Sequence, residues 1–367
     1  MGPLNGIKII EFSGIGPGPF CGMALADLGA EVITIKRDSE KGSHSKYDIH
    51  NRSKKTLTAN LKNELTKNEI IKLITQMDGL IEGYRPGVME SLGLGPDDCL
   101  KINPRLVYGR MTGWGQEGPL SQTAGHDINY IAITGALHSM GRKNDAPSPP
   151  LNLIGDYGGG GMHLALGMTS AFIHQIKTGE GQIVDSAMID GTSMLMSFFY
   201  SFQQMGYWED KRESNLLDGA AHFYDTYECS DGKYLAIGSI EPQFYKILLE
   251  RLEINDADFA NQMDKTMWPE LKTKIAEIII TKERGEWESV FKDSDGCVTP
   301  VLSILEAPNH SHNINRQTFT KLDGVIQPSP SPRFSKTKLD ISHNSREVGI
   351  NNKDLIEEYK LNPEAFI

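Results

Sequence analysis

Short apolar runs alternate with longer amphipathic segments along the first hundred or so residues of the chain. The runs have the length and residue types of buried strands, and the segments before the last three runs are expected to be helices. The expected strands are Lys8–Phe12, Glu31–Ile35, Gly79–Tyr84 and Leu106–Met111, and the first expected helix runs from Cys21 to Leu28 and ends at Gly29. This order predicts an α/β fold with a Rossmann-like, doubly wound parallel sheet. Ligands of such sheets bind at the carboxyl ends of the strands.

The turn after the first strand, GIGPGPF, partly matches the glycine-rich fingerprint of dinucleotide-binding domains. Gly14 and Gly16 fit this fingerprint, but Pro19 occupies the position of its third glycine. At the end of the second strand, where the fingerprint has a carboxylate, the chain has Lys36 and Arg37. A basic pair at this place favours a phosphorylated ribose, which both NADP and coenzyme A carry.

The pattern changes in the second half of the chain. Leu153–Gln175 joins four consecutive glycines to an apolar helix, and the glycines predict a close contact between helices. One helix is expected over Ile189–Met205, followed by a β-hairpin and a proline-started helix, which open a smaller α+β domain ending near Ala307. The proline-rich Gln327–Arg333 is expected to be an extended linker. The predicted domains are a large domain over 1–190, a linker helix over 191–220, a small domain over 221–310, a return linker over 311–335, and a C-terminal segment over 336–367 that packs back on the large domain.

Composition narrows the possible partners. A net charge of −11 and a pI of about 5.4 argue against nucleic acid or an anionic membrane as the main partner, so any polyanionic ligand must meet a local basic cluster. No uninterrupted apolar run approaches membrane-spanning length. The four cysteines are far apart and form no C-x-x-C pair, which suggests neither zinc nor a disulfide framework. We therefore expect a cytoplasmic protein, or a mitochondrial or peroxisomal one in a eukaryote, although the last residues are not an S-K-L-type signal.

Three ionisable residues stand in unusual local settings. His126 follows a glycine-punctuated loop at the start of an apolar helix, although a lone histidine is more often a structural residue. Asp156 precedes the glycine run and by default would cap the following helix. Glu241 stands where a strand meets a proline-started helix, again a capping position by default. Taken one at a time, none of the three identifies a catalytic site.

The segments that carry these residues resemble, as a set, the signature segments of the α-methylacyl-CoA racemase family, a branch of the family III CoA-transferase superfamily. They are GHDINY from Gly125, LNLIGDYGGGG from Leu151, LDGAAHFYDTY from Leu217 and IEPQFY from Ile240, with further matches in GIGPGPF, LADLGA, RPGVMESLGLG, NPRLVY and VTPV. The resemblance extends from about residue 4 to about residue 335. Several linked motifs in one order are more specific than any single motif.

The resemblance implies roles for the three residues and for a neighbour. His126 and Asp156 would be the two acid/base catalysts, and Glu241 would be hydrogen-bonded to the histidine. Inverting a carbon next to a thioester carbonyl requires one group to remove the α-proton from one face and another to return a proton on the other, with no metal or redox cofactor. Backbone N–H groups at the helix start around Asp127 are expected to stabilise the enolate oxygen. The substrate would be an acyl-CoA thioester.

The same resemblance assigns the opening turn to coenzyme A rather than to a dinucleotide. The expected ligand-binding residues are Ile15, Gly16 and Pro17 in the turn; Lys36, Arg37 and Arg85 for the phosphates; Ala59, Asn60, Leu61 and Lys62 around the adenine; and Tyr84, Gly125 and Tyr130. Asn60 departs from the aspartate that is usual in the family, which puts a contact through that side chain in doubt. The family fold is a large Rossmann-like domain with a small α+β domain in an interlocked homodimer. Glu241 would then reach His126 of the other subunit.

Three other readings remain open. A family III CoA-transferase would use Asp127 as a nucleophile that forms an acyl anhydride with the substrate acid. An NADP-dependent reductase is suggested by the strand–helix–strand unit and the basic pair, and weakened by Pro19. A non-catalytic acyl-CoA-binding protein is the third. The set of His126, Asp156 and Glu241 favours the racemase.

Overall fold

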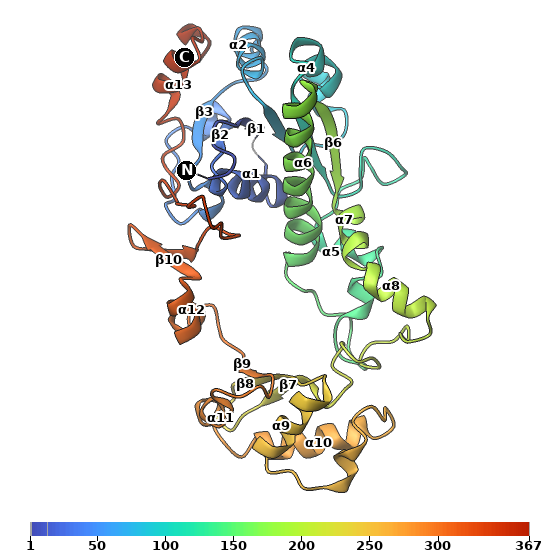
Figure 1. Ribbon diagram of the computed structural model, residues 1–367. Helices are drawn as coiled ribbons and strands as arrows, with labels where there is room; N and C mark the ends of the chain where they lie inside the picture. Colours follow the sequence, from blue (N-terminus) through green and yellow to red (C-terminus); the bar gives the residue numbers. More distant parts are fainter. Residues whose placement is uncertain (1, 13, 367) are drawn as a thin grey trace. The chain divides into compact units, whose positions relative to one another are not determined.

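The computed structural model describes residues 2–12 and 14–366 and divides into two compact units (Figure 1). Unit 1 comprises residues up to 135, residues 150–196 and residues from 311 onward, and unit 2 comprises residues 136–149 and 197–310. The structural division therefore places 136–149 with the smaller unit, although the sequence pattern grouped this stretch with the large domain. Among the described residues, no helix is long and apolar enough to cross a membrane.

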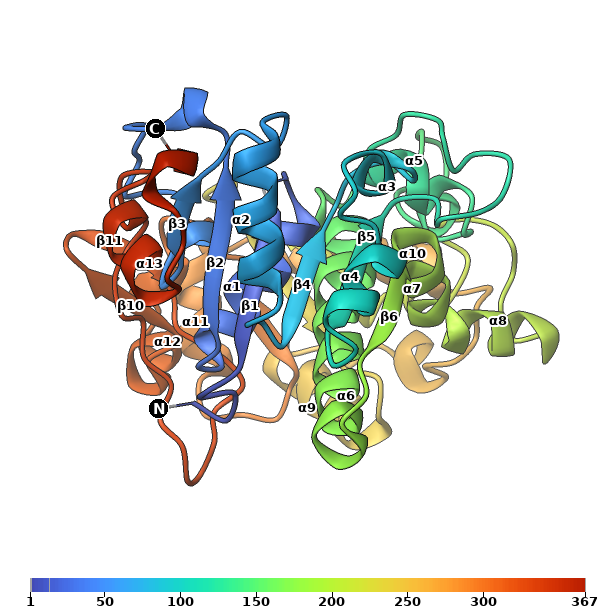
Figure 2. The ribbon, with the colours of Figure 1, turned by 90° about the horizontal axis from the view of Figure 1, so that it is seen from above.

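Unit 1 is built on a six-stranded parallel sheet of order β3-β2-β1-β4-β5-β6, as expected for a doubly wound fold (Figure 2). The strands are β1 Lys8–Phe12, β2 Glu31–Lys36, β3 Lys55–Thr58, β4 Gly79–Glu82, β5 Val107–Thr112 and β6 Gln182–Ala187. Four of them match the four predicted strands. The two outer strands were not predicted, because the short β3 (KTLT) has only one large apolar residue and most of the edge strand β6 is exposed or half-buried.

Side chains alternate between the two faces of this sheet, and each face has its own apolar core. Ile10 and Phe12 of β1 belong to the core formed with α2 (Glu64–Ile74) and α4 (Pro96–Ile102), whereas Ile9 belongs to the core formed with α1 (Pro17–Asp27) and α6 (His163–Thr178). Helix α1 begins one turn earlier than predicted, since Pro17 suits the first position of a helix. Gly29, with φ of +102°, follows its end as predicted.

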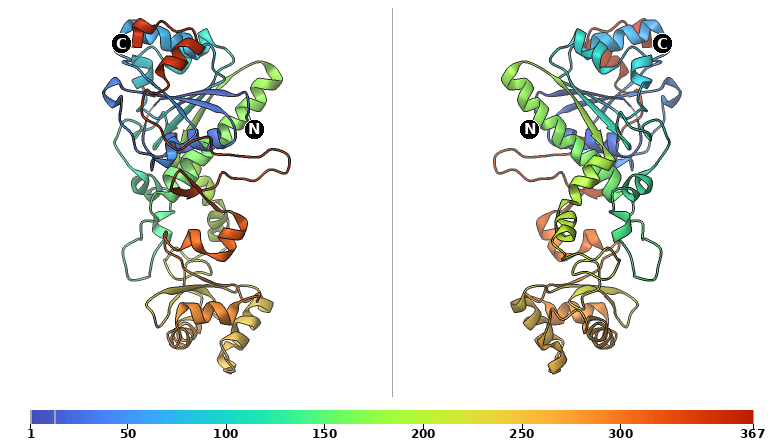
Figure 3. Two further views of the ribbon diagram at one scale, coloured as in Figure 1. Left: turned by 90° about the vertical axis from the view of Figure 1, so that its left-hand side faces the viewer. Right: turned by 90° about the vertical axis from the view of Figure 1, so that its right-hand side faces the viewer.

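The C-terminal segment packs into the core beside α2 and β3 (Figures 1 and 3). Helix α13 (Asn352–Glu358) contributes Leu355 and is followed by buried Tyr359 and Phe366. Thr66 of α2 donates a hydrogen bond from Oγ1 to the Ala365 carbonyl at 2.6 Å. This segment completes one face of the sheet.

Two segments differ from the pattern prediction. The expected single helix over Ile189–Met205 is two helices, α7 (Met188–Leu195) and α8 (Ser197–Gln204), separated at Met196, where the division between units also falls. Met196 N–H bonds to the carbonyls of Thr192 and Ser193, which tightens the last turn of α7. The return segment is not only a linker, because it contains α12 (Ser311–Arg316) and a hairpin of β10 (Phe319–Leu322) and β11 (Val325–Pro328).

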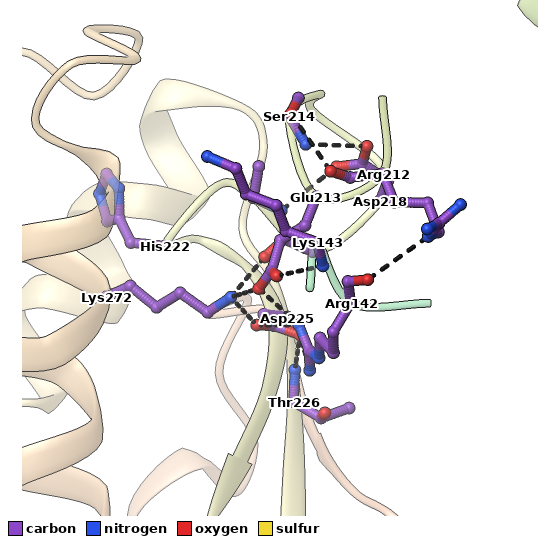
Figure 4. A network of polar contacts seen from close by, with 12 residues as sticks. Arg142, Lys143, Arg212, Glu213, Ser214, Asp218, His222, Asp225, Thr226 and Lys272 are labelled. Carbon is purple, nitrogen blue, oxygen red and sulfur yellow. Dashed lines mark hydrogen bonds and ion pairs between the residues drawn. The ribbon is translucent and has the colours of Figure 1, made fainter. Parts of the chain in front are cut away.

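Unit 2 has a three-stranded antiparallel sheet of β7 (Tyr224–Glu228), β8 (Tyr234–Gly238) and β9 (Val298–Pro300). Its core is formed with helices α9 (Pro242–Arg251), α10 (Trp268–Ile279) and α11 (Arg284–Phe291). Asp225 of β7 accepts two hydrogen bonds from Arg142, at 2.8 and 2.9 Å, and forms an ion pair with Lys272 at 2.6 Å (Figure 4). These contacts attach the 136–149 stretch to this sheet, which explains why it groups with unit 2.

Candidate active site

A cavity of about 600 Å³ opens in unit 1 at the carboxyl ends of β1, β4 and β5. This is the edge of a parallel sheet where ligands bind, because loops from several strands converge there. Its lining includes nine of the residues predicted from the sequence: Ile15, Gly16, Pro17, Tyr84, Arg85, Gly125, His126, Tyr130 and Asp156. We call this space the His126 cavity.

His126 enters the cavity from the start of α5 (Asp127–Ala132), where it is the N-cap residue. Its backbone is extended, and its N–H donates to the Oδ1 atom of Asn129 at 3.0 Å. The side chain is exposed in unit 1. The cap holds the histidine at a defined place while its imidazole stays accessible.

Asp156 lies inside a ten-residue π-helix, Leu153–Met162, rather than at a helix cap. Its Oδ2 atom accepts a hydrogen bond from Nδ2 of Asn152 at 3.0 Å. Its backbone N–H donates to Oδ2 of Asp127 at 2.7 Å. The helix that begins beside His126 therefore holds the backbone that carries Asp156.

Asp127 itself is only 6% exposed and lines neither of the cavities described in this subsection. Its Oδ1 atom is buried and has no hydrogen-bond partner within the described part of the chain. Burial raises the pKa of this carboxyl, and the nearby Asp156 charge acts in the same direction, while the N–H groups of Asp156 and Gly155 oppose the shift. The Asp127 carboxyl therefore lies behind the wall of the site, bonded to the Asp156 backbone, and does not line either cavity.

The opening turn contacts Asp156 directly. A Cβ atom built on Gly16 would lie 3.0 Å from Oδ2 of Asp156, and Gly16 has a φ of +68°. Both the close approach and the backbone conformation favour glycine at this position. The glycine-rich turn and the Asp156 carboxylate thus form one wall of the His126 cavity.

Tyr130 closes another part of the wall. Its ring lies edge-on to Trp114 with 4.8 Å between centroids, and its hydroxyl donates to the Gly125 carbonyl. Burial raises the pKa of the Tyr130 phenol, and the Asp156 charge adds to this shift while Arg85 opposes it. The tyrosine therefore stabilises the loop before His126.

A second cavity, of about 1060 Å³, lies at the carboxyl ends of β2 and β3, and we call it the Arg37 cavity. Its lining includes the predicted ligand-binding residues Lys36, Arg37, Ala59, Asn60, Leu61 and Lys62. Asn60 accepts a hydrogen bond from the Lys62 N–H at 3.1 Å, which uses its side-chain oxygen within the loop. The two cavities share Gly14, Ile15, Gly16, Pro19, His50 and Tyr84 as lining residues, so they meet at the opening turn.

Glu241 lies in unit 2, at the N-cap position of α9. Its carbonyl accepts from the N–H groups of Phe244 and Tyr245, but its exposed side chain makes no capping hydrogen bond to this helix. The predicted hydrogen bond between Glu241 and His126 stays a prediction. Within the described residues, no group of three or more His, Cys, Asp or Glu side chains is arranged to hold a metal ion.

The sequence pattern did not identify several residues that line the His126 cavity, namely His50, Trp114, Asn152 and Tyr157. His50 belongs to a short 3-10 helix that has no fingerprint of its own. Tyr157 lies in the π-helix directly after Asp156, and its place in the segment LNLIGDYGGGG was an available signal.

The model of CoA-transferase family III matches residues 4–350. The chain belongs to this family. Family III relatives include the α-methylacyl-CoA racemases of Mus musculus, 41% identical, and Homo sapiens, 40% identical, each aligned over 99% of this chain and 95% of the relative. A CAIB/BAIF family protein from Brucella suis has the same fold, with a TM-score of 0.84, 24% identity, and coverage of 98% of this chain and 99% of that protein. The family III assignment covers both the racemase and the transferase readings of the site.

Proposed function

We propose that this family III enzyme is a racemase that interconverts (2R)- and (2S)-2-methylacyl-CoA thioesters. The observation that carries the proposal is that His126 and Asp156 line one cavity, which meets a second cavity lined by Arg37, Lys36 and Lys62. The first cavity supplies two proton-transfer groups, and the second supplies cations for phosphates. The names of the mouse and human relatives support the same substrate class.

The proposed reaction moves one proton off the α-carbon and one proton on. One of His126 and Asp156 removes the α-proton from one face, and the electron pair of the C–H bond moves into the thioester carbonyl to give an enolate. The other group then delivers a proton to the opposite face, and the reverse direction exchanges the roles. Backbone N–H groups at the very start of α5, around Asp127, are proposed to donate to the enolate oxygen. No metal or redox cofactor takes part in this proposal.

The position of Asp127 favours the racemase over the transferase. A carboxylate nucleophile must reach the carbonyl carbon of its substrate, whereas Asp127 is buried, lines neither cavity and already accepts the Asp156 N–H. We therefore propose that Asp127 orients Asp156.

We further propose that the enzyme acts as an interlocked homodimer in which Glu241 of one subunit approaches His126 of the other. Apolar side chains on and after α8 are exposed in the single chain, among them Phe198, Met205 and Tyr207, which are 46%, 64% and 67% exposed. Large exposed apolar side chains that cluster in one stretch are typical of an interface. Sedimentation with activity measured in parallel should show an active dimer that persists on dilution, because interlocked chains separate only when one of them unfolds; a fully active monomer would contradict the proposal.

The function is tested by incubating one epimer of a 2-methylacyl-CoA in deuterium oxide without an acceptor acid. We expect α-deuterium incorporation together with loss of optical purity. His126→Ala and Asp156→Ala should each lower the rate by about 10²–10⁴-fold and leave CoA affinity unchanged.

Asp127→Asn distinguishes a racemase from a CoA-transferase. The amide oxygen of asparagine still accepts the Asp156 N–H, but asparagine cannot form an acyl anhydride. A racemase should keep most of its activity in this variant. No exchange in the wild type, with CoA transfer that Asp127→Asn abolishes, would instead establish the transferase.

A further inference from the structure

His50 lies where the His126 cavity and the Arg37 cavity meet. It is the middle residue of a short 3-10 helix, Ile49–Asn51, and it lines both spaces. The proposed catalysts line only the His126 cavity, and the basic residues Lys36, Arg37 and Lys62 line only the Arg37 cavity. A ligand that occupies both cavities crosses the junction that His50 lines together with the opening turn and Tyr84.

Two aromatic rings hold the His50 imidazole in place. Its centroid is 5.8 Å from Phe20 and 5.5 Å from Tyr157, with interplanar angles of 81° and 80°. Phe20 and Tyr157 also pack on each other, with 4.7 Å between centroids. Phe20 belongs to α1 and Tyr157 follows Asp156, so the imidazole is positioned by the two elements that form the wall of the catalytic cavity.

The ring nitrogens of His50 are available to a ligand. Within residues 2–12 and 14–366, the contacts of this imidazole are ring contacts, and neither nitrogen has a hydrogen-bond partner. Burial lowers the pKa of His50, and the positive charge of Lys54 adds to the effect, while Asp48 and Glu11 oppose it. The neutral ring therefore offers one donor and one acceptor, which is the complement of an amide group.

We propose that His50 binds an amide of the pantetheine arm of coenzyme A and thereby sets how far the thioester reaches toward His126 and Asp156. This inference rests on the proposed acyl-CoA substrate. The arm joins the nucleotide to the thioester and carries two amides, so it is the part of the ligand that occupies the junction of the cavities. His50 is a binding residue in this assignment and transfers no proton.

Calorimetric titration of the purified enzyme tests the assignment without turnover. His50→Leu should weaken the binding of CoA by about tenfold, the effect of about one hydrogen bond, and leave the binding of 3′,5′-ADP unchanged, because that nucleotide lacks the arm. His50→Gln keeps a donor and an acceptor and should recover part of the CoA affinity. His44→Leu, an exposed histidine on the same segment that lines neither cavity, is the matched control and should bind both ligands normally.

Two results would overturn the assignment. Unchanged CoA affinity in His50→Leu would show that the imidazole makes no contact with the arm. Equal weakening of CoA and 3′,5′-ADP would show that His50 only supports the fold of the opening turn. Both results are independent of racemisation: an inactive wild type with His50-dependent CoA binding would refute the proposed function alone.

Kinetics locate the contact along the arm. In His50→Leu, KM should rise for a 2-methylacyl-CoA and for the corresponding acyl-pantetheine, whereas a simple alkyl thioester without amides should react with the same kcat/KM as in the wild type. A loss of the same size for the alkyl thioester would contradict a contact with the arm.

Discussion

A buried ion pair between Glu11 and Lys54 lies beneath the opening turn. We expect the stability of unit 1 and its affinity for CoA to depend on this pair. The side chains are 1% and 0% exposed, and Nζ of Lys54 lies 2.7 Å from Oε2 of Glu11. Nζ also donates to the Pro19 carbonyl at 2.8 Å, and the Thr34 hydroxyl donates to Oε1 of Glu11 at 3.3 Å. Pro19 lines both cavities, so this pair connects the strand β1 to the wall of the site.

Lys54→Met should destabilise unit 1 by about 3–5 kcal/mol, because methionine fills a similar volume but leaves the Glu11 carboxylate buried with one hydroxyl donor. The double variant Glu11→Leu/Lys54→Met removes both charges, so we expect it to be substantially more stable than the single variant. CoA affinity should fall in Lys54→Met because the Pro19 carbonyl loses its donor.

The assay is hydrogen exchange measured by mass spectrometry on peptides from β1 and α1 over a series of urea concentrations, which reports the opening free energy of unit 1 by itself. Lys54→Arg, which keeps the charge, is the control and should lose less stability than Lys54→Met. The reasoning is refuted if Lys54→Met costs less than about 1 kcal/mol, or if the double variant loses the sum of the two single losses.

Two further predictions concern buried backbone and side chains elsewhere. His222 is 0% exposed, and burial lowers its pKa from 6.5 to about 4. As the pH falls, the unfolded state takes up the proton before the folded state does. The free energy of unfolding of unit 2 should therefore decrease by about 3 kcal/mol between about pH 6.5 and about pH 4. Unfolding followed by fluorescence across this range should show the slope, and His222→Gln should remove it. Gly191→Ala would place a Cβ atom 1.9 Å from the Gly159 carbonyl oxygen, so this substitution should displace the π-helix and reduce the rate of racemisation. Gly285→Ala is the control, because a Cβ atom at Gly285 has open space and should leave the rate unchanged. Equal activities of the two variants would contradict the close packing at Gly191.

The four central strands of the large sheet could be predicted from the amino-acid sequence. The runs that became β1, β2, β4 and β5 carry enough apolar and β-branched residues to identify strands, and their alternation with helices is sufficient to predict a parallel sheet. The edge strand β6 could not be found in this way, because half of it is exposed and its pairing with β5 comes from a distant part of the chain. The split between α7 and α8 was also missed, because Met- and Phe-rich sequence continues on both sides of Met196.

The candidate site also has one part that the sequence reveals and another that only the folded structure shows. His126, Asp156 and the basic residues at the strand ends stand in recognisable local motifs, so their identities were available from the sequence. The hydrogen bond from the Asp156 N–H to Asp127, and the closeness of Gly16 to the Asp156 carboxylate, join residues that are far apart along the chain. Only packing determines such contacts.

The sequence by itself determined the four central strands and their alternation with helices, the family, and the chemical types of the groups at the carboxyl ends of those strands. The tertiary structure alone decided that the Asp127 carboxyl is buried and accepts the Asp156 N–H, that Lys54 lies beneath the turn, and that His50 stands where two cavities meet. The physical reason is that local patterns encode the burial and the backbone geometry of neighbours in sequence. The surroundings of a buried charge or of an imidazole depend instead on atoms that the folded chain brings together from separate elements.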